Sequence, residues 1–268
     1  MTMRIQLLVS DVDGTIVRHD RTLAPSTIAA AARLREAGIR LALISSRPPR
    51  GLAVLGGPLA LDTPCAGFNG ALVQDEAGQT IAEHTIPETA CREAVARLEA
   101  DELDVWVFAV GEWLLRNERA AYIAREQLSI SMDWRVVSDF GPYLGRVHKV
   151  MGSSSDFARC AQAAADLSGA LGGEAAVLRS QDYYVDVTHP RANKGEAALV
   201  IAQRLGIAPA DMAAIGDMPN DLPMFAASSF AIAMGNASAA VKTAAQLVVA
   251  DNDSDGWAQA AEHLLGLL

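Results

Sequence analysis

The stretch Ile5-Gln6-Leu7-Leu8-Val9-Ser10-Asp11-Val12-Asp13-Gly14-Thr15 decides the fold, because an apolar run within it ends abruptly in two acids. The run is rich in Leu, Ile and Val and too short for an ordinary helix, so it predicts a buried strand. That strand delivers Asp11 and Asp13 to its carboxyl end, where Gly14 permits a tight turn.

The two acids predict a cation site. Ligands bind beyond the carboxyl ends of the central strands in an open α/β sheet. Because Asp11 and Asp13 are one residue apart and repel each other, a divalent ion that prefers oxygen ligands, such as Mg²⁺, would stabilise the pair. The alternative is a solvated Asp-rich turn, a common use of such residues. The rest of the chain favours the cation site.

Composition limits the possible partners. The chain has 268 residues, 51% of them hydrophobic, which supports one large α/β domain or a core with an inserted domain. Its 22 basic and 32 acidic residues give a net charge of −10. Since the basic residues form no cluster, we expect neither nucleic acid nor an anionic membrane surface as a partner. The uncharged residues 222–241 are interrupted by Pro, Gly, Ser and Asn, so they predict a turn, a strand and a turn instead of a membrane span.

The cysteines indicate a reducing compartment. Cys65, Cys91 and Cys160 are odd in number, far apart and without Cys-x-x-Cys spacing, so we expect three reduced thiols. The sequence enters its first strand without a charged leader or a small-residue cleavage site. Both features predict a cytoplasmic protein.

The pattern after the first strand alternates helix and strand. Residues 25–37 predict a helix that begins at Pro25 and ends before Gly38. Residues 39–44 predict a second strand, which the prolines at 48 and 49 prevent from continuing. Its tip carries Ser45, Ser46 and Arg47, which offer two hydroxyls and a guanidinium.

A third short strand over residues 65–68 ends at Asn69 and Gly70. Three strand tips on one edge of a parallel sheet would then present four polar side chains. These are Asp11, Asp13, Ser45 and Asn69.

Beyond Ala71 the rhythm changes. Residues 71–73 and 80–82 predict a hairpin, and residues 83–189 predict a separate α+β domain with an antiparallel sheet and helices on one face. The expected helices are 88–100 and 156–171, with a further short one, and the expected strands are 105–110, 113–115, 146–151, 175–178 and 183–187. Trp106, Trp113 and Trp134 lie in this domain and predict core packing.

After residue 189 the alternation of helix and strand seen at the start of the chain resumes. The expected elements are a helix over 194–205, a strand over 212–215, a short helix over 220–227, strands over 230–234 and 247–249, and a closing helix over 257–267. An insertion thus splits the core. The predicted domains are a core of residues 1–82 and 190–268 and an inserted domain of residues 83–189.

Four motifs that lie far apart in the sequence carry groups that can act together in one active site. Asp11-x-Asp13-Gly-Thr, Ser45, Lys194 and Gly216-Asp217-Met-Pro-Asn220-Asp221 supply a nucleophile, an acid, a hydroxyl, a cation and further carboxylates. In this order, over almost the whole chain, they resemble the haloacid dehalogenase (HAD) superfamily of phosphohydrolases.

The insertion resembles the large α/β cap, class IIB, of the Cof-type sugar phosphatase branch. The runs at 68–71, 189–195 and 253–256 are also similar to that branch. One departure is Ser45-Ser46-Arg47, where the family usually has Thr-Gly-Arg. Serine keeps the hydroxyl donor, but the loop is stiffer without that glycine and the geometry of Arg47 is less defined.

The resemblance implies a doubly wound, mostly parallel Rossmann-like core with an inserted α/β cap. It also implies a Mg²⁺-dependent phosphatase of small phosphorylated metabolites, foremost sugar phosphates. Asp11 would attack phosphorus to form an aspartyl-phosphate, and direct contact with Mg²⁺ would keep it ionised. Asp13 would protonate the leaving oxygen and later deprotonate water. This role requires a raised pKa of Asp13 in the Michaelis complex, which a neighbouring carboxylate and the incoming phosphate would provide.

The resemblance also assigns ligands. The metal would be held by Asp11, Asp217 and the backbone carbonyl of Asp13, with Asp221 ligating directly or through water. Substrate would be bound by Ser45, Ser46, Arg47, Asn69, Lys194 and Asn220, with Ser45 and Lys194 on the phosphoryl oxygens. Lys194 would thereby join Asp11 and Asp13 in catalysis.

Several alternatives stay open. Lys194 could be a solvated residue that opens a helix, and Asp217 or Asn220 could cap one. A phosphosugar mutase or phosphotransferase would share the aspartyl-phosphate, and a phosphosugar sensor would bind without catalysis. Both monomer and homodimer are compatible with the sequence. Possible substrate contacts in the insertion, which could equally be core or surface residues, are Asp182, Tyr183, Tyr184 and Asp186.

One motif is rejected on its context. Residues 251–262 match the calcium loop of an EF-hand, with acids or Asn at each required position and Gly256 at the turn. An EF-hand requires a helix before the loop, whereas residues 247–249 predict a strand. We expect these acids to cap the last helix instead.

Overall fold

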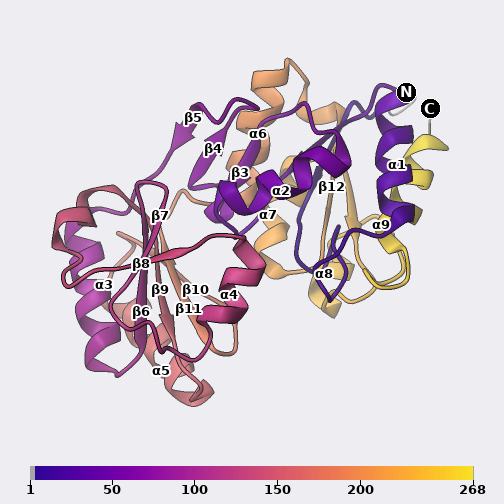
Figure 1. Cartoon of the computed structure of the whole chain (residues 1–268). Helices are drawn as coiled ribbons and strands as arrows, with labels where there is room; N and C mark the ends of the chain where they lie inside the picture. Colours follow the sequence, from indigo (N-terminus) through magenta and orange to yellow (C-terminus); the bar gives the residue numbers. More distant parts are fainter. Residues whose placement is uncertain (1–3, 268) are drawn as a thin grey trace. The chain divides into compact units, whose positions relative to one another are not determined.

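The computed structural model describes residues 4–267. The chain forms two compact units, one built from the segments up to Ala82 and from Asn193 onward, and one from Glu83 to Ala192 (Figure 1). The second crossing between the units lies after Ala192, slightly beyond the expected boundary after His189.

The first unit contains a five-stranded parallel sheet. Its strand order is β14-β13-β12-β1-β2, with β1 between β12 and β2. The strands are β1 (Leu7–Ser10), β2 (Arg40–Leu43), β12 (Met212–Gly216), β13 (Phe230–Ala233) and β14 (Leu247–Val248). The order reverses at β1, so the crevice beyond the carboxyl end of β1 is the preferred place for a ligand. The predicted parallel, Rossmann-like sheet is confirmed.

Helices cover both faces of this sheet. They are α1 (Pro25–Glu36), α2 (Pro49–Leu59), α6 (Lys194–Leu205), α7 (Leu222–Ala227), α8 (Ala239–Thr243) and α9 (Gly256–Leu265). Successive strand side chains point to opposite faces, so Leu8 packs in one hydrophobic cluster and Leu7 and Val9 in another. The first cluster includes residues of α1 and α9, which lie side by side (Figure 1), and the second includes residues of α6.

Helix α2 was not predicted. The prolines after the second strand indicated only that the strand ends, yet Pro49 is also the first residue of a helix, a position that suits its fixed φ. Gly56, Gly57 and Pro58 disguise the rest of the helix, because they are poor helix formers. Its buried face still has helical spacing, at Leu52, Leu55 and Leu59.

The expectation that residues 65–68 form a third strand of the parallel sheet was wrong. Strand β3 (Cys65–Gly67) pairs antiparallel with β4 (Leu72–Gln74) in a separate sheet of order β3-β4-β5, where β5 is Thr80–Glu83. Within residues 4–267, the two sheets meet at an isolated parallel bridge between Ile44 and Ala66. The strand ends early because the 3₁₀ turn Phe68–Gly70 reverses the chain, with φ of 58° at Asn69 and 100° at Gly70.

The second unit is an α+β domain, as predicted. Its six-stranded sheet has the order β10-β11-β9-β6-β7-β8, and all its pairs are antiparallel except β7 with β8. The strands are β6 (Asp104–Ala109), β7 (Glu112–Leu115), β8 (Trp134–Val136), β9 (Val147–Ser153), β10 (Ala176–Gln181) and β11 (Tyr184–Thr188). The α-helices are α3 (Glu88–Ala100), α4 (Ile123–Ile130) and α5 (Phe157–Ala170). Strand β8 was missed because it is short and mostly exposed.

One hydrophobic cluster joins α3 and α5 to one face of this sheet. Trp106 and Trp113 are fully buried on the sheet, as expected for core residues. The three cysteines are free. Among residues 4–267, no helix has the length and apolar character that a bilayer crossing requires.

Candidate active site

Two of the acids follow the carboxyl ends of neighbouring strands. Asp11 follows β1 and Asp217 follows β12, and the two parallel strands are joined there by a bond from the Asp11 amide to the Ile215 carbonyl (3.0 Å). Asp221 precedes α7, and its Oδ2 accepts hydrogen bonds from the backbone amides of Asp217 (2.9 Å) and Met218 (2.8 Å). The parallel sheet and the turn after β12 therefore bring three carboxylates together.

The glycine at the end of β12 makes room for this turn. A Cβ on Gly216 would lie 2.4 Å from the carboxylate of Asp221, closer than any real contact. Glycine is thus required at position 216 by the close approach of Asp221 to the strand end.

Lys194 joins two of the acids. It is the first residue of α6, whose N-cap Asn193 accepts a hydrogen bond from the Glu196 amide. Its Nζ donates to Asp11 Oδ1 and to Asp221 Oδ1, each at 2.6 Å, and the side chain is 1% exposed. This burial excludes the alternative of a solvated lysine that merely opens a helix.

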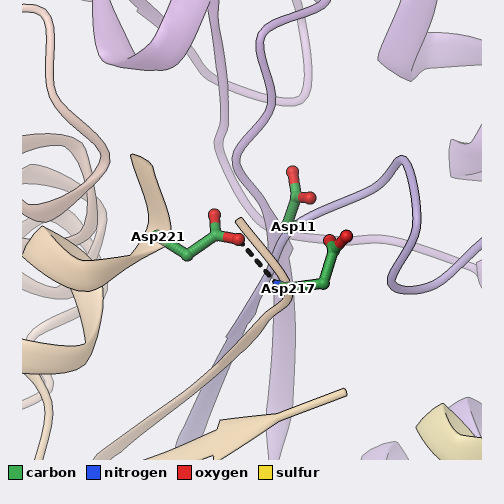
Figure 2. A group of neighbouring side chains, drawn as sticks. All are labelled: Asp11, Asp217 and Asp221. Atoms are coloured by element: carbon green, nitrogen blue, oxygen red, sulfur yellow. Dashed lines mark hydrogen bonds between the residues drawn. The ribbon is translucent and has the colours of Figure 1, made fainter. Parts of the chain in front are cut away.

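The carboxylates of Asp11, Asp217 and Asp221 converge at the strand ends (Figure 2). One oxygen of each lies within 4.8 Å of the others, close enough to share a metal ion. Three buried acids face one lysine, so the group carries excess negative charge. Oxygen ligands and uncompensated charge are what a hard divalent cation such as Mg²⁺ requires.

The pKa values reflect this excess. Burial raises the pKa of Asp11 well above its ordinary value, although the Lys194 charge opposes the shift. Burial and then the charge of Asp221 raise the pKa of Asp217 to about 6. Burial alone would lower the pKa of Lys194, but the charges of Asp11 and Asp221 raise it. A bound divalent cation would keep the acids ionised.

Asp13 is paired with arginine. Arg47 Nε donates to Asp13 Oδ2 (2.7 Å) and Arg47 Nη2 to Oδ1 (2.6 Å), and the guanidinium of Arg21 donates to the same Oδ1. Burial alone would raise the pKa of Asp13, but the bonds and charges of Arg47 and Arg21 hold it below its ordinary value. The raised pKa expected of Asp13 in the Michaelis complex stays a prediction, because a bound phosphoryl group would have to draw Arg47 and Arg21 away from this carboxylate.

Arg21 was not singled out from the sequence. It lies in the loop between β1 and α1, and its φ of 71° belongs to the left-handed region that favours glycine. No sequence motif marks such a position. The contact depends on how the loop folds back over Asp13.

The phosphate-binding candidates lie around these acids. Ser45 is buried, and its Oγ accepts a hydrogen bond from the Arg47 amide (3.2 Å). Asn69 remains beside Ser45 although β3 lies outside the parallel sheet, because the Asn69 amide donates to the Ser45 carbonyl (2.8 Å). Asn220 Nδ2 donates to Asn69 Oδ1 (3.0 Å). Ser46 is half-buried beside these residues in sequence.

Sequence reasoning missed two partners of Asp217. Thr15 Oγ1 donates to Asp217 Oδ1 (2.8 Å), and Asn236 Nδ2 donates to Asp217 Oδ2 (3.1 Å). Thr15 stood in the quoted motif without a role. Asn236 carried a usable signal, because it follows the predicted strand over 230–234 and so stands at another tip on the same sheet edge.

The rejected calcium motif forms a loop between β14 and α9. It is preceded by a strand, as expected. The expectation that its acids cap the last helix was wrong, because the N-cap residue Asp255 makes no side-chain bond to the helix. Its Oδ1 instead accepts from Ser26 Oγ (2.6 Å).

The four candidate contacts in the second unit differ in exposure. Asp182 is exposed and Tyr183 half-buried in the turn before β11, whereas Tyr184 and Asp186 are buried. Asp186 pairs with Lys149, with 3.0 Å between its Oδ1 and the lysine Nζ.

Comparisons with known proteins agree on one family. A family profile described as haloacid dehalogenase-like hydrolase matches residues 8–260. The pyridoxal phosphate phosphatase YbhA of Escherichia coli K12 is 27% identical, with 96% of this chain and 97% of that protein covered.

Solved structures share the fold. A haloacid dehalogenase-like hydrolase from Bacteroides thetaiotaomicron has a TM-score of 0.89 and 26% identity, with 97% of this chain and 100% of that chain covered. A sugar phosphatase of HAD subclass IIB has a TM-score of 0.83 and 23% identity, with 98% and 100% covered.

Proposed function

Since the chain belongs to the haloacid dehalogenase-like hydrolases and is a phosphatase, we propose that it is of the Cof type and hydrolyses small phosphorylated metabolites, foremost sugar phosphates, in a Mg²⁺-dependent reaction. The observation that carries this proposal is the buried Lys194, which bridges Asp11 and Asp221 beside Asp217. The three free thiols support a cytoplasmic location.

In the first step, an Asp11 carboxylate oxygen attacks phosphorus and the ester P–O bond breaks. Asp13 gives its proton to the leaving oxygen, so an alcohol departs and an aspartyl-phosphate remains. In the second step, water attacks that phosphorus, its proton passes to Asp13, and the bond to Asp11 breaks. Inorganic phosphate leaves, and both acids return to their starting states.

The metal site would be formed by Asp11, Asp217 and Asp221, with the backbone carbonyl of Asp13. When bound, Mg²⁺ would neutralise charge on these acids and on the phosphoryl oxygens. Lys194 supplies a fixed positive charge at the same place, because its two hydrogen bonds hold Nζ between Asp11 and Asp221.

The remaining polar groups would bind the phosphoryl group. Ser45 and Lys194 would contact its oxygens, and Ser46, Asn69 and Asn220 would orient the ester. Arg47 now holds Asp13. A phosphoryl group that accepts hydrogen bonds from Arg47 would release the Asp13 carboxyl for the leaving oxygen. The second unit would then select the substrate.

The test is phosphate release from a panel of sugar phosphates, nucleotides, small phosphorylated acids and pyridoxal phosphate. Pyridoxal phosphate is included because the Escherichia coli relative is named for it. We expect release that requires Mg²⁺, stops with chelator and is lost in Asp11→Asn. Labelled phosphate that is retained on a sugar when a bisphosphate is present would indicate a mutase instead. Ligand binding without turnover would indicate a sensor.

A further inference from the structure

Asn236, in the loop after β13, connects the acidic group to the C-terminal loop of residues 250–256. We propose that Asn236 is a positioning residue that holds Asp217 for the divalent cation, and that the C-terminal loop fixes Asn236. The inference rests on the proposed function only in taking Asp217 as a metal ligand.

Asn236 binds two segments of the site with one amide group. Its Nδ2 donates to Asp217 Oδ2 (3.1 Å) and to the Gly14 carbonyl (2.9 Å). Thr15 Oγ1 donates to the other oxygen of Asp217 (2.8 Å). Each oxygen of Asp217 therefore has a donor, so the plane of the carboxylate is set from both sides.

Asn236 is also held by the C-terminal loop. Its Oδ1 accepts a hydrogen bond from the backbone amide of Asn252 (3.3 Å). The side-chain Nδ2 of Asn252 donates to the Val17 carbonyl (3.0 Å). The chain of contacts thus runs from Asp217 through Asn236 and Asn252 to the segment after β1. It closes on that segment, because Gly14 and Val17 are near neighbours in sequence.

Close packing fixes the backbone beside Asn236. The Gly235 amide donates to the Ala250 carbonyl (3.0 Å), and Lys242 Nζ donates to the Gly235 carbonyl (2.6 Å). A Cβ on Gly235 would lie 2.6 Å from the Asp251 amide nitrogen and 2.7 Å from the Ala250 carbonyl carbon. Only glycine permits the two loops to approach this closely, so the position of Asn236 depends on the C-terminal loop.

The acids of the C-terminal loop bind the segment that follows the nucleophile. Asp253 Oδ1 accepts from the His19 amide (3.0 Å), and Asp255 Oδ1 accepts from Ser26 Oγ (2.6 Å). The motif that resembles a calcium loop therefore has a structural role in place of calcium binding. Its acids hold the segment after β1, and its Asn252 holds Asn236.

The physical reason for such an arrangement is the orientation of metal ligands. Hydrogen bonds to a ligating carboxylate hold it in the geometry that the ion needs, and their loss weakens metal affinity by about 10- to 100-fold. Without Asn236, Asp217 Oδ2 would lose its donor, and the carboxylate would turn about the remaining bond from Thr15.

The test compares Mg²⁺ binding by calorimetry in the native protein, Asn236→Ala, Asn236→Ser and Asn252→Ala. We expect both Asn236 variants to bind Mg²⁺ about 10- to 100-fold more weakly. Asn252→Ala keeps the backbone bond to Asn236 and removes only the side-chain bond to the Val17 carbonyl, so it should weaken binding less than the Asn236 variants. The matched control is Asn117→Ala, which removes an exposed bond to Asp104 in the second unit and should bind Mg²⁺ like the native protein.

A second readout separates positioning from general damage. In a positioning role, the Asn236 variants recover their turnover at saturating Mg²⁺, whereas a damaged site does not. Native Mg²⁺ affinity in both Asn236 variants, or turnover that saturating Mg²⁺ does not restore, would overturn the inference. If the native protein and Asp217→Asn bind Mg²⁺ equally, the metal site of the proposed function is wrong as well.

Discussion

At the residue scale, Arg47 shows how one side chain can serve two partners in turn. It is 5% exposed and forms a two-bond pair with Asp13, yet its place beside Ser45 suits a phosphoryl group. Lysine would keep the charge but lose the paired geometry.

We expect Arg47→Lys to lower kcat/KM at least about tenfold, because hydrogen bonds to charged groups contribute about 1.5–3 kcal/mol. Steady-state kinetics on the best substrate of the panel measure this. The control is Arg50→Lys, at an exposed position on α2. Equal kinetics for Arg47→Lys and Arg50→Lys would contradict a role of Arg47 in the reaction.

Lys194 carries a prediction about stability. Removal of one partner from a buried ion pair typically costs about 3–5 kcal/mol, because a charge remains uncompensated. We expect Lys194→Met to lower the free energy of unfolding by roughly that amount in chelator. Urea denaturation measures it. Since Mg²⁺ would compensate the same acids, added Mg²⁺ should stabilise the variant more than the native protein, and the absence of this difference would count against a shared site.

The thiols give a prediction that depends on pH. Burial raises the pKa of Cys65 to about 11 and that of Cys91 to about 12, both above the ordinary 9.0. The thiolate is the reactive form, so at pH 8 these two cysteines should alkylate at least roughly 100-fold more slowly than in the unfolded chain. The rate should rise about tenfold per pH unit up to the pKa. Mass spectrometry after timed alkylation checks this, and fast modification of Cys91 in folded protein would contradict it.

At the scale of elements, the turn between β6 and β7 is strained. Val110 has φ of 56° and Gly111 φ of 74°, the left-handed pattern of a two-residue hairpin that prefers Asn-Gly. A β-branched residue is unfavourable there, and Val110 is 44% exposed, so little packing offsets the strain.

We therefore expect Val110→Asn to raise the free energy of unfolding by about 0.5–1 kcal/mol. Urea denaturation of both proteins measures the change. The matched control is Val136→Asn, at an exposed position within strand β8, where asparagine should be neutral or destabilising. A loss of stability in Val110→Asn would show that Val110 has a packing role.

The same elements show what sequence patterns can and cannot predict. Strands β1 and β12 were predictable because they are fully buried, apolar runs that are followed directly by Asp11 and Asp217. Helix α2 was hidden by its glycines and Pro58, and the pairing of β3 depends on the turn at Asn69 and Gly70. Arg21 was missed because its contact depends on how a loop folds back, which no local pattern records. Asn236 was missed although its place after a predicted strand could have indicated it.

At the scale of the whole molecule, all proposed site residues lie in the first unit. The second unit is one continuous segment, Glu83–Ala192, with its own hydrophobic cluster and a complete sheet.

We expect residues 83–192 to fold alone, and the first unit with a short linker in place of this segment to retain Mg²⁺ binding. Circular dichroism with thermal unfolding tests the first expectation, and calorimetry tests the second. A folded first unit that binds no Mg²⁺ would mean that the second unit contributes to the metal site.

The order of the strands in the parallel sheet has a consequence for synthesis of the protein. Strand β1 lies between β2 and β12, and the Asp11 partner Lys194 is 183 residues further along the chain. Domains fold as units while a chain is being made. On a ribosome, the second unit can therefore fold first, while β1 still lacks its neighbour β12. Chains stalled before residue 212 should then show a protease-resistant segment 83–192 and a sensitive amino-terminal segment. The nucleophile would stay in an unfinished sheet until β12, β13 and β14 emerge, so a nascent chain would hydrolyse nothing before that point.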